Sequence, residues 1–85
     1  MPVISRFFGI VVSMYWRDHL PPHFHAKYQD EEVTIEIESG MVVGHLAPKA
    51  ISLLQEWRLL RKAELVADWE LARQKRSLHR IAPLE

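Results

Sequence analysis

Glu32-Val33-Thr34-Ile35-Glu36-Ile37-Glu38 is the clearest strand signal in the chain. Polar and apolar residues alternate throughout it, and successive side chains of a strand point to opposite faces. Val33, Ile35 and Ile37 therefore share one face, while the polar residues share the other. The stretch predicts a strand that is packed on one face only.

Three further segments are predicted as strands, at residues 10–16, 23–28 and 41–45. Gln29-Asp30-Glu31 supplies a turn before the strand at 32–38. Ser39-Gly40 supplies a tight hairpin after it, because glycine takes the positive φ that such turns need. The sheet is therefore predicted to be mainly antiparallel.

The strands at 23–28 and 32–38 form a predicted hairpin, and residues that face each other must lie on the same face of the sheet. With a short turn, the facing pairs are Lys27 with Glu32, His25 with Thr34, and His23 with Glu36. A turn longer by two residues would set Glu36 opposite His25. Either register places a carboxylate across from one histidine of the pair.

Two helices are predicted after the strands. Pro48 suits the first turn of a helix, and the following apolar residues recur at the spacing of one helical face. After Arg61 the apolar stripe rotates, which indicates a break near residues 61–63 and a second helix to about Gln74. One bent helix is the alternative, since no glycine or proline marks the break. The apolar residues of the tail, 78–84, are expected to pack on the body.

The predicted fold class is α+β, in a single domain of residues 1–85. A small antiparallel sheet of three to four strands has two C-terminal helices packed on one face. Val33, Ile35 and Ile37 should be buried beneath the helices, and the other face should stay open and polar. The residues expected to form the rest of the core are Phe7, Phe8, Trp16, Leu53, Leu54, Trp57 and Trp69.

The composition narrows the functional classes. Eleven basic and eleven acidic residues give zero net charge, which does not signal a large nucleic-acid-binding surface. The absence of cysteine excludes disulfides and thiolate metal sites and favours a reducing cytoplasm. No apolar run approaches the roughly 18 residues of a membrane span, and the N-terminus lacks the features of a signal peptide.

Basic residues concentrate in the tail, where they are candidates for binding a partner protein or nucleic acid together with Lys27. A solvated helix end is the more common interpretation of such a run. The tail residues concerned are Arg73, Lys75, Arg76 and Arg80.

Residues 15–28 form the candidate site, because three of the five histidines lie between positions 19 and 25. His23 and His25 alternate on one strand, so their side chains should point the same way about 6.6–7 Å apart. Such a pair is typical of general acid–base catalysis on a scissile RNA phosphate without metal. Amphipathic surface histidines bonded to backbone carbonyls are the simpler interpretation.

Other residues have expected supporting roles in that catalytic hypothesis. Glu36 would orient one imidazole and raise its pKa. Arg17 or Arg6 would stabilise developing negative charge. The candidate site also includes Asp18 and His19.

Metal binding is the second hypothesis for the same residues. His19, His23 and His25 supply imidazoles, and Asp18 or Glu36 a carboxylate, which makes three or four ligands. The spacing matches no known ligand motif, and Asp18 is typical of a turn. The sequence therefore favours metal-free catalysis, with no cofactor.

A family resemblance rests on residues 4–12, on Asp18-His19 with Pro21-Pro22-His23-Phe24-His25-Ala26, and on residues 69–73. These segments resemble a small bacterial family, domain of unknown function 4160. The resemblance implies the toxin-like half of a type II toxin–antitoxin pair, with a small antitoxin-like protein as partner, and supplies no catalytic residues. The histidines add the hypothesis of a ribonuclease acting on RNA. The alternative is a non-catalytic interaction module that binds a partner through the open sheet face and the basic tail.

Overall fold

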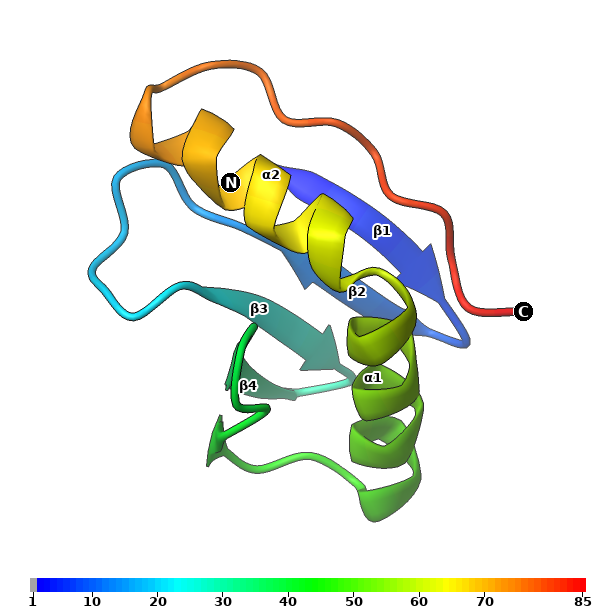
Figure 1. The fold of residues 1–85 in the computed structure, drawn as a ribbon. Coiled ribbons are helices and arrows are strands. Elements are labelled where there is room, and N and C mark those ends of the chain that lie inside the picture. The colour runs from blue at the N-terminus through cyan, green and yellow to red at the C-terminus, as the bar shows by residue number, and fades with distance from the viewer. Residues whose placement is uncertain (1) are drawn as a thin grey trace.

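The computed structural model describes residues 2–85, which form a five-stranded antiparallel sheet and two helices. The elements are β1 (Val3–Phe7), β2 (Ile10–Ser13), β3 (His23–Tyr28), β4 (Glu31–Glu36), β5 (Val42–Gly44), α1 (Pro48–Leu60) and α2 (Lys62–Arg73). Strands that are consecutive in sequence are neighbours in the sheet. Both helices lie in front of the same face of the sheet in Figure 1. The α+β class is confirmed.

The sheet has one strand more than predicted, because β1 was not recognised. The register of β1 against β2 shifts between Val3 and Ser5. This irregularity interrupts the two-residue alternation on which a strand prediction depends.

The predicted register of the central hairpin is confirmed. Lys27 pairs with Glu32, His25 with Thr34, and His23 with Glu36. On the other side of β3, His25 pairs with Ser13 of β2. The histidines therefore lie in the middle of the sheet and not at its edge.

The core lies between the sheet and the helices, as predicted. Val33, Ile35 and Ile37 are buried, and so are Trp57 and Trp69. Of the helix residues expected in the core, Leu54 is fully buried and Leu53 is only partly buried at its margin. The Trp57 ring meets Phe24 of β3 edge-on, with centroids 5.6 Å apart.

The two helices meet at Arg61, where the break was predicted. The backbone there has φ −113° and ψ 19°, which ends α1. The second helix begins at Lys62, and its last helical residue is Arg73. The change of direction lets each apolar stripe face the same core.

The C-terminal tail docks on the body, as expected. Ile81 and Leu84 are buried. The Ile81 N–H donates to the Ile4 carbonyl oxygen over 2.8 Å, and the Trp57 Nε1–H donates to the carbonyl of Ala82 over 2.8 Å. Figure 1 shows the tail running beside β1.

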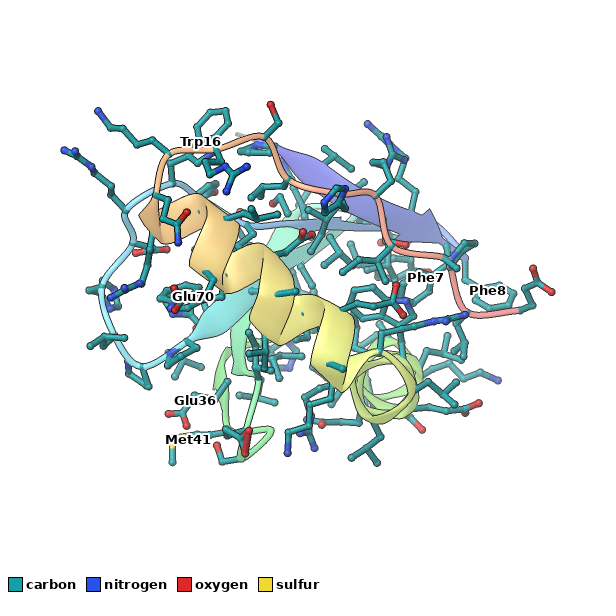
Figure 2. The ribbon with its side chains drawn as sticks, turned by 45° about the horizontal axis from the view of Figure 1, so that its top comes forward. Phe7, Phe8, Trp16, Glu36, Met41 and Glu70 are labelled. Atoms are coloured by element: carbon teal, nitrogen blue, oxygen red, sulfur yellow. The ribbon has the colours of Figure 1, made fainter. Side chains whose placement is uncertain are left out.

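Two aromatic residues expected in the core are exposed. Phe8 is 59% exposed, because it lies at the tip of the β1–β2 turn with a φ of 50°. Trp16 is 47% exposed, because β2 ends at Ser13 and the chain turns away before it. Its Nε1–H donates to the Arg76 carbonyl oxygen over 2.9 Å, which places it at the C-terminal end of α2 (Figure 2).

Candidate functional site

Asp18, His23 and His25 come together in one cluster, called the histidine cluster below. His23 and His25 alternate with the buried Phe24 along β3. Asp18 lies in the loop of residues 14–22, which connects β2 to β3. Alternation on the strand aligns the two imidazoles, and the loop brings the carboxylate to them.

A single oxygen atom joins the cluster. Asp18 Oδ2 lies 2.9 Å from His23 Nε2 and 3.0 Å from His25 Nε2. The other carboxylate oxygen, Oδ1, accepts a hydrogen bond from the His19 N–H over 2.8 Å. Asp18 is thus both the turn residue that the sequence indicated and the centre of the cluster.

Each imidazole is also held on its far side. Nδ1 of His23 donates to the Pro21 carbonyl oxygen over 2.7 Å. Nδ1 of His25 is buried and has no hydrogen-bond partner among residues 2–85, and Glu32 Oε2 lies 3.4 Å from it. The Pro21 hydrogen bond fixes the orientation of the His23 ring.

Aromatic rings pack on the two imidazoles. The Tyr15 ring lies 4.0 Å from the His25 ring, centroid to centroid, with 38° between the planes. The Trp69 ring lies 5.3 Å from the His23 ring. Through Trp69 the cluster contacts α2 and hence the core.

The carboxylate and the phenol beside it have shifted pKa values. Burial acts to raise the pKa of Asp18, but hydrogen bonds from His25 and the His19 N–H, with the charge and hydrogen bond of His23, bring its pKa below the usual value. Burial raises the pKa of Tyr15, and the charges of Glu32 and Asp18 raise it further. Asp18 is therefore ionised and Tyr15 protonated at neutral pH.

The expected open position of the histidines is wrong in one respect. The His23 side chain is only 6% exposed and that of His25 only 13%. The loop carrying Asp18 lies over them, which the strand alternation did not indicate. Since both Nε2 atoms face the same oxygen, the two rings form one unit and do not flank a space for a phosphate.

Glu36 does not have the predicted role. Its Oε1 accepts a hydrogen bond from Ser39 Oγ over 2.7 Å, so it belongs to the β4–β5 connection. Asp18 instead supplies the carboxylate that contacts both imidazoles. Register alone placed Glu36 opposite His23 but did not show where its side chain turns.

A small hollow of about 100 Å³ adjoins the cluster on the side of His23. Its lining includes the exposed apolar residues Met41 and Val43. Leu20, which is also exposed, lies between the lining residues His19 and Pro21 in the sequence. Figure 2 shows Glu36 and Met41 near each other at this end of the sheet. The lining residues are His19, Pro21, His23, Thr34, Glu36, Met41 and Val43.

The remaining predicted site residues lie around the cluster or away from it. The His19 ring is 83% exposed, and its Nε2 lies 3.7 Å from Asp18 Oδ1. Arg6 and Arg17 are exposed, and within residues 2–85 neither forms an ion pair with the cluster. The Arg17 N–H donates to the Ala72 carbonyl over 3.3 Å, which ties the loop to the end of α2.

The basic residues proposed for partner binding are all exposed. Arg73 forms an ion pair with Glu70 over 3.4 Å between Nε and Oε2. Lys27 lies on the face of the sheet that the helices leave uncovered. Lys75, Arg76 and Arg80 follow α2, and the Arg76 carbonyl oxygen accepts the hydrogen bond from Trp16.

Tyr15, Glu32 and Trp69 are neighbours of the cluster that were not predicted from the sequence. A signal was present for the first two. Tyr15 lies two residues after Ser13, which pairs with His25, and Glu32 pairs with Lys27, two residues after His25. Trp69 had no such signal, because its approach to His23 depends on how α2 crosses the sheet.

A larger hollow of about 420 Å³ lies at the other end of the sheet. Its walls are mainly apolar, and Lys49 is the one charged residue among them. Among residues 2–85, its lining includes none of the cluster residues, so the hollow is separate from the cluster. Its lining residues are Phe8, Ile10, Tyr28, Ala47, Lys49, Ala50 and Leu53.

The fold and the cluster together define a small α+β protein with a histidine–carboxylate centre on strand β3 and the loop that precedes it. The chain belongs to the family described as Domain of unknown function (DUF4160), whose sequence profile matches residues 9–70. The matched segment includes β2 to β5, α1 and the whole cluster. No curated protein and no solved structure matches the chain. Neither helix of residues 2–85 has the length and apolar character needed to cross a membrane.

Proposed function

We propose that this protein is the toxin-like half of a type II toxin–antitoxin pair and that it cleaves RNA at the histidine cluster. One observation carries the catalytic part of the proposal. Two imidazoles and an ionised carboxylate converge within hydrogen-bonding distance beside a hollow. Such convergence is typical of a reactive centre, since an isolated surface histidine has no need of it.

The burial of the cluster supports the same proposal. Two rings, Tyr15 and Trp69, pack on the imidazoles, and both Nδ1 atoms are shielded from solvent or hydrogen-bonded. Rings held from several sides are preorganised, which is what a catalytic centre requires. The cluster acts as one unit in this proposal, in place of the separated acid and base expected from the strand spacing.

The family resemblance supports the toxin part. It implies that a small protein is encoded beside this one and antagonises it. The exposed apolar residues around the hollow, Leu20, Met41 and Val43, offer a surface that such a protein would cover. The partner would then block the hollow directly.

The test is growth and RNA cleavage with matched variants. Expression of the chain alone should arrest growth, and expression with its genomic neighbour should restore it. The purified chain should cleave RNA, and His25→Ala should lower the rate by about 10²–10⁴. His45→Ala is the matched control, because His45 also pairs with a carboxylate, Glu31, over 2.8 Å but lies at an exposed site.

Circular dichroism and thermal unfolding should show that the His25 variant is folded. A folded wild-type chain that arrests growth and leaves RNA intact would refute the ribonuclease proposal. A chain that never affects growth, alone or with its neighbour, would refute the toxin proposal as well.

A non-catalytic interaction module is the second candidate, and the exposed residues Leu20, Met41 and Val43 favour it. Strand β5 also lies at the edge of the sheet, where a partner strand can add. In that case Val43→Asp should abolish binding of the partner, and His25→Ala should leave binding largely unchanged. The catalytic proposal predicts instead that His25→Ala lowers RNA cleavage much more than Val43→Asp does.

A further inference from the structure

The hydrogen bonds of His23 leave an unbalanced contact in the cluster. The Pro21 carbonyl can only accept a hydrogen bond, so Nδ1 of His23 carries the proton in that 2.7 Å contact. Nε2 therefore carries either a lone pair, when the ring is neutral, or a second proton, and it faces Asp18 Oδ2 over 2.9 Å. A lone pair and a carboxylate oxygen at that distance repel each other unless a metal ion lies between them.

The second imidazole converges on the same oxygen. His25 Nε2 lies 3.0 Å from Asp18 Oδ2. Donor atoms from all three residues lie within 4.8 Å of one another. The cluster therefore offers two nitrogen ligands and one carboxylate to a single point.

We propose that Asp18, His23 and His25 bind one divalent first-row transition-metal ion. Two histidines and one carboxylate are a ligand set that suits Fe²⁺, Mn²⁺, Co²⁺ and Zn²⁺. The ion would replace the lone-pair contact between His23 and Asp18 with two coordination bonds. This site goes beyond the proposed function, because it stands whether or not the protein cleaves RNA.

The two contacts of Asp18 Oδ2 suit a carboxylate oxygen that is adjacent to both nitrogen ligands in an octahedron. At a metal–ligand distance of about 2.1 Å, donor atoms about 3.0 Å apart subtend an angle of about 90° at the ion. A tetrahedral ion would require a separation of about 3.4 Å. The observed 2.9 and 3.0 Å therefore match a six-coordinate ion with the smaller adjustment.

The outer contacts of both rings are those of metal-bound histidines. A metal-ligating imidazole donates its other N–H to a backbone carbonyl or a carboxylate, which fixes its tautomer. His23 does so to Pro21. The buried Nδ1 of His25 has Glu32 Oε2 at 3.4 Å, where a small movement of an exposed side chain completes the same arrangement.

The hollow of about 100 Å³ has His23, one of the three proposed ligands, in its lining, so we expect an ion to enter from that side. His19 lies at the rim with its ring exposed. His19 is not one of the three proposed ligands, but its exposed Nε2 could contact an ion that enters the site. Loss of His19 should therefore change affinity less than loss of His23.

A doubly protonated His23 is the competing account of the same contact. In that account both ring nitrogens donate, and Asp18 compensates a buried imidazolium. The two accounts differ in what happens when metal is added, so the test is direct.

The experiment uses the full chain without any affinity tag, freed of metal by a chelator that is then removed. Titration with Zn²⁺ and with Co²⁺, followed by calorimetry, should give one ion per chain. In ¹⁵N spectra of the wild-type protein, Zn²⁺ should shift Nε2 of both His23 and His25, while Nδ1 of His23 keeps its proton. This readout needs no substitution and is independent of any activity.

Variants then assign the ligands. His23→Ala and Asp18→Asn should each weaken Zn²⁺ binding by more than about 100-fold, exceeding the loss known for outer-contact residues. His45→Ala should change it less than about twofold, because the His45–Glu31 pair is exposed and remote from the cluster. Nε2 signals that do not move with Zn²⁺, or stoichiometric binding that survives both cluster substitutions, would overturn the site.

The outcomes for metal and for RNA are separable. A chain that binds one Zn²⁺ at the cluster and leaves RNA intact keeps the metal site and loses the ribonuclease proposal. A chain that cleaves RNA in the presence of chelator, with unshifted Nε2 signals, keeps the ribonuclease proposal and loses the metal site.

Discussion

The two faces of the sheet are built on opposite principles, although every strand contributes to both. Ile35 on the helix-covered face is fully buried among aliphatic and aromatic side chains. Its neighbour Thr34 lies on the other face, beside the hollow whose lining includes His23 and Glu36. One face gains stability by removing apolar area from water, and the other holds charged groups close together at some cost. Changes on the two faces should therefore separate stability from function.

The largest expected effect on stability lies on the covered face. Ile35→Ala should lower the free energy of unfolding by about 2–4 kcal/mol, through lost burial and the cavity left behind. Urea denaturation followed by tryptophan fluorescence would measure it. Thr34→Ala is the control on the neighbouring residue and should cost less than about 1 kcal/mol. Equal losses at the two positions would contradict the division between the faces.

The helix-covered face is not wholly apolar, because it also contains a buried cation, Arg58. Arg58 of α1 donates from Nη1 to the Ile37 carbonyl over 2.9 Å and from Nε to Gln55 Oε1 over 2.9 Å. Its guanidinium also fills the space beside Gly40, where an added Cβ would lie 2.6 Å from Nη2. Arg58 thus fixes the β4–β5 connection to α1.

Arg58→Ala should cost about 1.5–3 kcal/mol, the usual value of hydrogen bonds to a charged group, because it leaves backbone carbonyls unpaired. Thermal and urea unfolding would measure the loss. Arg61→Ala is the matched control, since the side-chain ion pair that residues 2–85 give Arg61 is a partly exposed one with Glu64 over 3.3 Å, and such pairs contribute less than about 1 kcal/mol. A loss at Arg58 no greater than that at Arg61 would mean that the buried hydrogen bonds add nothing net.

The contrast between the faces explains which parts of the fold could be predicted from sequence. Burial of Val33, Ile35 and Ile37 follows from period-two alternation, and the break at Arg61 follows from a rotated stripe, because apolar burial leaves a periodic trace. Strand β1 leaves a weaker trace, since its register shifts near Val3. Arg58 leaves no periodic trace, because the sequence does not distinguish a buried arginine from a solvated one.

The histidine cluster was predicted in part, for a related reason. Alternation placed His23 and His25 on one face, and pairing placed Glu36 across from His23, both correctly. Alternation says nothing about loops, so it could not show that residues 14–22 bring Asp18 over both rings. The choice of Glu36 over Asp18 as the orienting carboxylate was wrong because strand partners are visible in a sequence pattern and loop partners are not.

The smallest expected effect concerns Asp68, a buried carboxyl of α2 on the covered side. Its Oδ1 accepts a hydrogen bond from the His79 N–H over 3.0 Å, while Oδ2 is buried and has no hydrogen-bond partner within residues 2–85. Burial raises the pKa of Asp68 above its usual 3.8, against the lowering effect of the His79 hydrogen bond and charge. The fold therefore holds this proton more tightly than the unfolded chain does.

The sign of the pH dependence follows from that order of pKa values. Below pH 3.8 both states are protonated, and Asp68 adds no pH dependence. As the pH rises from there to the raised pKa of the folded state, the unfolded chain releases its proton first, and stability falls. Above the raised pKa the loss is constant.

Asp68→Asn keeps an acceptor for His79 but carries no charge. The stability of the variant should therefore rise relative to that of the wild type through this window, by no more than about 1 kcal/mol, the size of one net hydrogen bond. Urea unfolding of both chains between pH 4 and 8 would measure the difference, with Glu70→Gln as an exposed control on the same helix. Parallel curves for wild type and Asp68→Asn would show that the buried carboxyl titrates as it does in the unfolded chain, and that the covered face tolerates its charge as easily as the histidine face tolerates Asp18.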